Sequence, residues 1–363
     1  MPTHDDQKFG ETISLLRPWG LQYGMLKVVP PQSWSENVLD KDFKKTFNIP
    51  PHTIDIDIFL YSKGYIKLWK NQPTLNYKAH WKKVEADDKN LRSVCPLPVL
   101  NQYQPLEANT KAVEDWLFKV IDGYYRVWEG PYQYGTLFRQ EVAGWNPGRL
   151  DCEPSGWIRR NTSVTARHLA EFSGWSRELD GMVTVNYLHK SSEPIMWQVV
   201  APRHHGEMVI FLNRGCGCAP IPLLSPLTPL PGQRTNLPAC ITPGTIPLNL
   251  LISQQELHQQ ARIPVDSIFQ ESKAFILTFE NATFAYTCLG EGKTEELGYT
   301  HGYWDPSVES ERYEGSKKRP QDSSEGDRPL GVMRDHVIDV FETAKMVGHE
   351  GLMERLPSKI TLI

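Results

Sequence analysis

The 363-residue sequence lacks the features that mark several large classes of protein. Its six cysteines are few and scattered, too dispersed for a disulfide-stapled secreted domain, and we interpret them as reduced thiols. No apolar run approaches the length of a membrane span, and the polar residues 1–10 lack the basic-then-apolar layout of a signal peptide. From these absences we expect an intracellular location and no membrane partner.

An excess of charge of one sign is also missing. The net charge is -4 at pH 7, and the charged fraction of 23% is ordinary for a globular chain. A chain with this balance does not wrap nucleic acid electrostatically, and the basic pairs Lys82-Lys83 and Arg159-Arg160 are too short to form a basic patch. Direct binding to nucleic acid is therefore not indicated.

The sequence does contain many short β-prone runs and a few helical stretches. Isoleucines alternate with aspartates over residues 53–61, which predicts a half-buried strand, and apolar residues at helical spacing predict a helix over 107–121. Further strands are predicted at 182–188, 196–200, 208–212, 248–253 and 274–279, and a short helix at 254–261. Short strands with turn residues between them favour a β-sandwich or barrel with flanking helices, which is a mainly β, α+β class.

Three stretches lie outside this pattern. Residues 218–247 hold eight prolines and are predicted to be irregular, because proline interrupts both helices and central strands. Residues 308–329 are rich in Glu, Ser, Lys, Asp and Gly, which predicts a disordered linker. Residues 333–352 return to helical periodicity and predict a C-terminal helix, which we expect to dock on the core rather than bind a partner.

Four stretches, in order along the chain, resemble the lysine demethylases that pair a JmjN with a JmjC domain. Residues 24–34 (GMLKVVPPQSW) are similar to the JmjN signature, an apolar strand that ends in Pro-Pro-x-x-Trp. Residues 134–138 (YGTLF) and 145–150 (WNPGRL) resemble the segments that lead into the JmjC domain.

The third and fourth stretches resemble the centre of the JmjC domain. The third comprises residues 186–189 (NYLH), then Glu193-Pro194 and Trp197. The fourth comprises residues 263–265 (IPV), Gln270-Glu271 and residues 275–279 (FILTF).

The resemblance covers roughly residues 10 to 304 and implies a double-stranded β-helix, a jelly roll of the cupin type. It divides the chain into a JmjN-like segment at 8–51, a mixed linker and helical region at 52–144, a JmjC-like jelly roll at 145–304, a disordered linker at 305–330 and a C-terminal helical segment at 331–363.

The resemblance also implies where an iron site would lie. The family oxidises methyl-lysine on histone tails with Fe(II), 2-oxoglutarate and O2, and holds the iron with two histidines and one carboxylate. These positions fall on Ser176, Glu178 and Phe284. A hydroxyl is a poor substitute for imidazole and a benzyl group cannot ligate, so we expect a vestigial site without Fe(II). Glu178 then needs a cation, for which Arg177 and Arg167 are candidates, or must be protonated.

The cosubstrate and substrate positions have changed in parallel. The 2-oxoglutarate positions fall on Phe138, Asn186 and Ile195, and only Asn186 matches the family. The tyrosines that surround methyl-lysine fall on Val164 and Ala166. Burying a carboxylate against Phe and Ile without a donor costs several kcal/mol, so 2-oxoglutarate is not expected to bind.

Other histidines offer alternative metal ligands, but their patterns do not favour a rebuilt iron site. His168 and Glu171 are three residues apart, which would place them on opposite faces of a strand. His204 and His205 are expected at the end of a strand, and His301 lies beyond the distal ligand position. Each is interpreted as a solvated or structural histidine.

A zinc alternative rests on Cys216, Cys218 and Cys240. With His204 or His205 they could complete a tetrahedral set, but the family's own zinc-site residues are not matched. Loop thiols without metal are the preferred interpretation, so zinc is not expected.

Three hypotheses follow for the function. The leading one is a nuclear, JmjC-like pseudoenzyme that binds no cofactor and serves as a chromatin-associated binding or scaffold protein, with chromatin proteins or a histone tail as partner. The first alternative is an Fe(II)- and 2-oxoglutarate-dependent histone lysine demethylase with non-standard metal ligands. The second is a jelly-roll protein-interaction module unrelated to chromatin.

Overall fold

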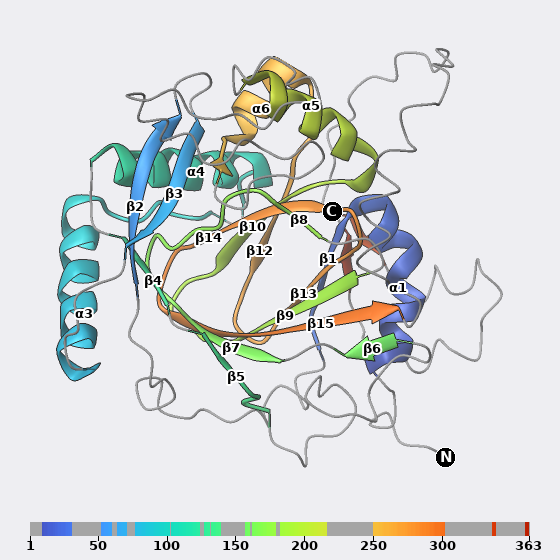
Figure 1. The fold of residues 1–363 in the computed structure, drawn as a ribbon, viewed down its shortest axis with the longest axis horizontal. Coiled ribbons are helices and arrows are strands. Elements are labelled where there is room, and N and C mark those ends of the chain that lie inside the picture. The colour runs from blue at the N-terminus through green and yellow to red at the C-terminus, as the bar shows by residue number, and fades with distance from the viewer. Residues whose placement is uncertain are drawn as a thin grey trace, which may run out of the picture.

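The structure is a computed structural model that describes residues 9–30, 52–59, 64–70, 77–101, 103–123, 127–130, 132–138, 157–159, 162–178, 182–215, 250–301, 336–338 and 360–362. Over these residues the protein is mainly antiparallel β-sheet with a few helices, compatible with a β-sandwich (Figure 1). The α+β prediction is therefore confirmed. No helix among the described residues is long and apolar enough to cross a membrane.

The described helices flank the sheets (Figure 1). They are α1 (Phe9–Tyr23), α3 (Tyr77–Val94), α4 (Leu106–Asp122), α5 (His205–Gly215) and α6 (Gln254–Ala261), with a 3-10 turn η4 (Pro202–His204) before α5.

The described strands form three sheets. The nine-stranded sheet has the order β16 (His336–Ile338), β17 (Ile360–Leu362), β1 (Met25–Val28), β13 (Phe275–Thr278), β9 (Met182–Ser191), β15 (Gly292–His301), β7 (Ser163–Arg167) and β5 (Tyr132–Tyr134), and β6 (Trp157–Arg159) also pairs with β15. A four-stranded sheet has the order β12 (Asp266–Gln270), β10 (Ile195–Val200), β14 (Thr283–Cys288) and β8 (Ser176–Arg177). A second four-stranded sheet has the order β11 (Leu250–Leu251), β3 (Gly64–Lys70), β2 (His52–Phe59) and β4 (Val127–Glu129).

From β7 onward the chain passes back and forth between the first two sheets. Strands β7, β9, β13 and β15 lie in the nine-stranded sheet, and β8, β10, β12 and β14 lie in the four-stranded sheet opposite. Each sheet therefore receives strands from both halves of this region, and neighbours in a sheet are distant in sequence.

One face of the nine-stranded sheet packs against α1. Ile13 and Leu16 of the helix share a core with Tyr187 of β9 and Leu277 of β13. The helix lies close to the sheet at Gly20, where an added Cβ would come within 2.2 Å of the Phe279 ring. Helix α1 therefore needs a glycine at this point of contact.

The other face of this sheet packs against the four-stranded sheet. Ile276 of β13 and Trp197 of β10 belong to one buried core between the two sheets. On the far side of β10, Met196 shares a core with Val113 of α4. The described core is thus layered as helix, sheet, sheet and helix.

Most of the predicted elements are confirmed. The strands expected at 53–61, 182–188, 196–200 and 274–279 correspond to β2, β9, β10 and β13, and the helices expected at 107–121 and 254–261 correspond to α4 and α6. The strand expected at 248–253 is confirmed only over Leu250–Leu251. The JmjN-like motif does contain a strand, β1, which pairs with β13.

The strand predicted at 208–212 is wrong, because these residues lie in helix α5. A run of five apolar residues is as compatible with a buried helix as with a strand. The burial is one-sided: Met208 is fully buried, whereas Ile210 is 52% exposed. Pro202 opens the preceding 3-10 turn, so His204 and His205 lie at the start of a helical segment rather than at a strand end.

The C-terminal helix prediction is wrong at the residues that can be compared. Residues 336–338 form β16, which pairs with β17, and β17 pairs in turn with β1. The β-branched Val337 and Ile338 suit a strand, and sheet pairing overrides a short helical periodicity. The rest of residues 333–352, and the stretches at 218–247 and 308–329, lie outside the described residues.

Candidate functional site

The three positions that the resemblance assigns to vestigial iron ligands come together at one edge of the sandwich. Strand β8 pairs with β14 so that Ser176 lies directly opposite Phe284. The Glu178 backbone N–H donates to the carbonyl of Ala282 at 2.8 Å, so the pairing of the two chain segments continues one residue beyond β8. Ser176 and Glu178 are two residues apart on an extended chain, so their side chains point to the same side as Phe284.

Glu178 is 5% exposed, and its carboxylate has a neutral hydrogen-bond donor. The Thr278 hydroxyl donates to Glu178 Oε2 at 3.0 Å. Of the two cations expected beside Glu178, Arg177 donates to the Asn281 side chain and Arg167 pairs with another carboxylate, described below. The expectation that Arg167 serves Glu178 is therefore wrong.

Aromatic rings line the space between the sheets along β14. The Trp197 ring centroid lies 6.2 Å from that of Phe284 and 5.3 Å from that of Tyr286. The guanidinium of Arg167 lies 4.6 Å from the Tyr286 ring centroid. Position 284 thus carries a side chain that packs against Trp197 and offers no atom that binds metal.

The expected 2-oxoglutarate positions are only partly brought together. Ile195 lies in the core between the sheets. The side-chain amide of Gln270 donates to Asn186 Oδ1 at 3.3 Å and accepts from the Trp197 indole N–H at 2.8 Å, so Asn186 faces the same core. Asn186, Gln270 and Trp197 are thus linked by buried side-chain hydrogen bonds.

Phe138 lies on the opposite face of the nine-stranded sheet. Its ring packs against Tyr187 and His189, with centroid distances of 5.1 Å and 4.8 Å. Val164 pairs with Glu295, and the Glu295 carboxylate contacts His189, so Val164 belongs to this face too. Ala166, two residues further along β7, shares it.

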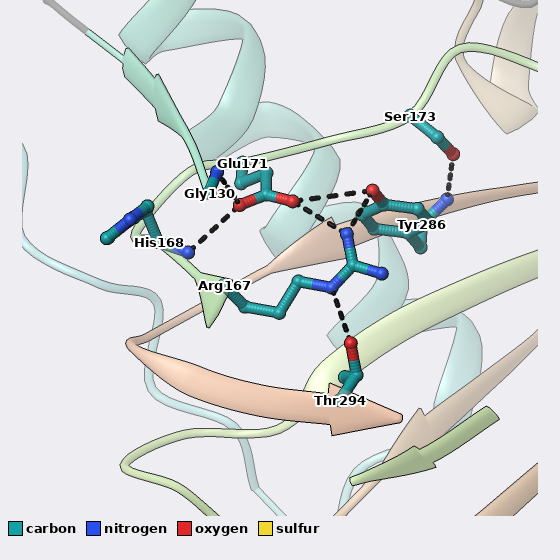
Figure 2. Close-up of polar contacts among 7 residues, drawn as sticks. All are labelled: Gly130, Arg167, His168, Glu171, Ser173, Tyr286 and Thr294. Atoms are coloured by element: carbon teal, nitrogen blue, oxygen red, sulfur yellow. Dashed lines mark hydrogen bonds and ion pairs between the residues drawn. The ribbon is translucent and has the colours of Figure 1, made fainter. Parts of the chain in front are cut away.

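A buried ionic cluster, which was not predicted from the sequence, lies beside these aromatic rings. Arg167 Nη1 donates to Glu171 Oε1 at 2.7 Å and to the Tyr286 hydroxyl at 2.5 Å. Arg167 Nε donates to the Thr294 hydroxyl at 2.9 Å. Figure 2 shows the side chains of Arg167, Glu171 and Tyr286 pointing toward one another.

The Glu171 carboxylate joins three segments of the chain. Besides Arg167, it accepts from the backbone N–H groups of Gly130 and His168, each at 3.1 Å, and from the Tyr286 hydroxyl at 3.4 Å. Burial raises the pKa of Tyr286 well above its ordinary range despite the opposing charge of Arg167, so the phenol stays protonated and can donate.

The cluster forms because the strand ends earlier than the sequence suggests. Strand β7 ends at Arg167, and Ala170 adopts a left-handed backbone conformation with φ of 59°. The chain therefore turns, and Glu171 points back toward Arg167 instead of lying on the opposite face of a strand from His168. A spacing of four between an arginine and a glutamate was the available signal in the sequence.

Two of the histidines interpreted as solvated or structural, His168 and His205, are buried. Burial lowers the pKa of His168 to about 4, and Figure 2 shows its ring turned away from the Glu171 carboxylate. Burial, with the charge of Arg177, also lowers the pKa of His205 to about 4. Both rings are therefore neutral at pH 7. His204 contacts Glu207 at 2.8 Å, and His301 ends β15 opposite Trp157.

The donor set at the iron positions does not fit Fe(II). It offers one carboxylate, already bonded to Thr278, with one hydroxyl and a phenyl ring, whereas the facial triad needs two imidazoles. Within the part of the chain that the structure describes, no three His, Cys, Asp or Glu side chains gather as a metal site. The zinc candidates Cys216, Cys218 and Cys240 lie outside that part. No protein-family model matches the sequence, and no curated protein matches it either.

Proposed function

We propose that the chain is a JmjN–JmjC-type jelly roll whose iron centre has been dismantled, and that it acts as a nuclear, chromatin-associated binding or scaffold protein. The observation that carries the proposal is the register of β8 and β14. It sets Ser176 opposite Phe284, with Glu178 two residues further on, at the positions that the resemblance assigns to the three iron ligands.

The strand order supports the jelly roll. The strands β7, β8, β9, β10, β12, β13, β14 and β15 are taken as first to eighth. The nine-stranded sheet then contains the order sixth, third, eighth, first, and the sheet opposite has fifth, fourth, seventh, second. This is the pairing that arises when a long hairpin winds into two facing sheets. Strand β1 of the JmjN-like segment extends the first sheet beside β13, which supports a joined JmjN and JmjC unit.

The chemistry of the interior supports binding over oxidation. A single carboxylate and a hydroxyl give too few strong donors for Fe(II), and Phe284 packs against Trp197 where an imidazole would be needed. Without the metal there is no group to activate oxygen. The chromatin partner, whether a histone tail or another chromatin protein, and the nuclear location follow from the family resemblance.

The first test rebuilds the metal site. The variant S176H/F284H restores two imidazoles next to Glu178, and we expect it to bind Co²⁺ with one ion per chain, measured by calorimetry and by Co²⁺ visible absorption. The single variants S176H and F284H are matched controls, because each supplies only one of the missing imidazoles, and the unaltered protein should show no stoichiometric binding. If the double variant binds no better than the singles, the three positions do not converge as proposed.

The second test separates the proposal from its rivals. Stoichiometric iron in the unaltered protein, with succinate released from 2-oxoglutarate, would establish the demethylase alternative and end the pseudoenzyme proposal. A protein that neither fractionates with nuclei nor binds histone peptides would leave only the jelly-roll interaction module.

A further inference from the structure

An acidic residue interrupts the buried face of helix α3. Val84, Leu91 and Cys95 are buried at helical spacing, and Asp88 occupies the same stripe with only 3% of its surface exposed. Leu91 and Cys95 share a core with Leu169 and Leu289. Leu169 follows β7, and Leu289 follows β14, so both belong to the sandwich. Asp88 thus lies at the contact between α3 and the sandwich.

Few groups at this contact favour an ionised Asp88. Glu291, in the turn between β14 and β15, faces it with a like charge, and Asp87 adds a second from α3 itself. Arg92 and the backbone N–H of Leu169 act in the opposite direction. Within the described residues neither Asp88 carboxyl oxygen has a hydrogen-bond partner of normal geometry, although both are shielded from solvent.

We propose that Asp88 and Glu291 form a proton-controlled latch that holds α3 against the turn at residues 289–291. The latch is closed while Asp88 is protonated and loosens when Asp88 ionises beside Glu291. The reason is physical: a neutral carboxyl group tolerates the apolar contact, whereas a carboxylate there is desolvated and faces a second carboxylate. This proposal is independent of the JmjC resemblance.

The direction of the pH effect follows from the two states of Asp88. Burial, reinforced by Glu291, raises the pKa of Asp88 from 3.8 to about 7 in the folded protein. A raised carboxyl pKa means that the closed state holds the proton more tightly, so closure is strongest below pH 4 and weakens as the pH rises to about 7. Over that interval the opening constant should rise about tenfold per pH unit and then level off.

Native-state hydrogen exchange of the α3 amides in the full chain tests the latch between pH 5 and pH 8, after division by the intrinsic exchange rates. The opening constant of the unaltered protein should rise about fiftyfold from pH 5 to pH 7, since the profile begins to level off near pH 7. D88N should show no such rise, because an amide does not titrate. D87N is the matched control: an asparagine carbonyl can still accept from the Trp128 indole, as Asp87 does at 3.0 Å. Asp88 still titrates in this variant, so the slope should remain, and the plateau should shift less than in Glu291→Gln because Asp87 acts on Asp88 more weakly than Glu291 does.

Glu291→Gln provides a second variant at a half-buried turn position, which does not depend on D88N folding. Removing the like charge should move the plateau to lower pH while keeping the slope below it. A flat profile in the unaltered protein, or a D88N profile that still rises tenfold per pH unit, would overturn the latch.

Discussion

Replacing Glu171 by glutamine should destabilise the fold more than almost any other isosteric change. The carboxylate accepts from Arg167 at 2.7 Å, from the Tyr286 hydroxyl at 3.4 Å and from the backbone of Gly130 and His168 at 3.1 Å. A glutamine side chain keeps one carbonyl oxygen, and its amide group would direct two N–H donors at groups that are themselves donors. At least two buried donors therefore lose their acceptor.

The magnitude follows from this geometry. An unsatisfied buried donor costs about 1–3 kcal/mol, so two cost about 2–6 kcal/mol. Removing one partner of a buried ion pair costs about 3–5 kcal/mol by independent measurements on other proteins. Arg167 and Glu171 have side chains that are 7% and 0% exposed, so solvent does little to compensate. We expect E171Q to lower the free energy of unfolding by about 3–5 kcal/mol.

Urea unfolding of E171Q, R167M and the double variant E171Q/R167M measures both the loss and the coupling. The double variant should lose less than the sum of the singles, because its apolar side chain no longer leaves a buried charge unpaired. Lys111 and Asp115 are the matched control: they have the same spacing, but are 59% and 64% exposed, so D115N should cost at most about 0.5 kcal/mol. An E171Q loss below about 1 kcal/mol, or strictly additive singles, would refute the structural role of the cluster.

Two further substitutions probe the packing around this core. Gly130→Ala should abolish or severely weaken folding, because the added Cβ would lie 1.6 Å from the carbonyl oxygen of Ala166, and thermal unfolding measures this loss. G206A is the control: its added Cβ meets no atom in helix α5, so stability should be unchanged or rise by about 0.5–1 kcal/mol. Glu114 is buried and accepts from the Gln198 side chain at 2.8 Å, and burial raises the pKa of its carboxyl group. The folded protein therefore favours the protonated acid, and the free energy of unfolding should fall as the pH rises through the carboxyl range. E114Q should remove that part of the pH dependence, and an unchanged profile of unfolding free energy against pH would contradict the assignment.

The sequence predicted the elements whose apolar pattern has only one structural solution. Strand β2 alternates isoleucine with aspartate, and α4 repeats its apolar residues at helical spacing over seventeen residues, so neither pattern fits another element. The five apolar residues at 208–212 fit two, and the choice depended on a proline at the start of the preceding turn and on which side chains met the core.

The candidate site was predictable only in part. Resemblance to a family can place Ser176, Glu178 and Phe284 on neighbouring strands, but it cannot show which side of a sheet a loop residue joins. Phe138 lies on the far side of the sheet from Asn186. Nor can a local pattern show where a strand ends. The position of Glu171 depends on Ala170, which adopts a left-handed backbone conformation. Glycine usually marks such a position in a sequence, and here the residue is alanine, so the turn has no sequence signal.

The aromatic rings between the sheets bear on where a partner would bind. Trp197 is buried, Phe284 and Tyr286 are partly buried and pack against it, and Arg167 lies over the Tyr286 ring, so a lysine side chain that enters there must displace these groups. A demethylase must admit its substrate there, whereas a scaffold can bind its partner on the outer faces. The rebuilt variant S176H/F284H therefore discriminates twice. As a scaffold it should gain Co²⁺ and keep the same affinity for any histone peptide that the unaltered protein binds. If changing these interior residues weakens peptide binding tenfold while the fold stays intact, the partner enters the interior and the scaffold proposal fails.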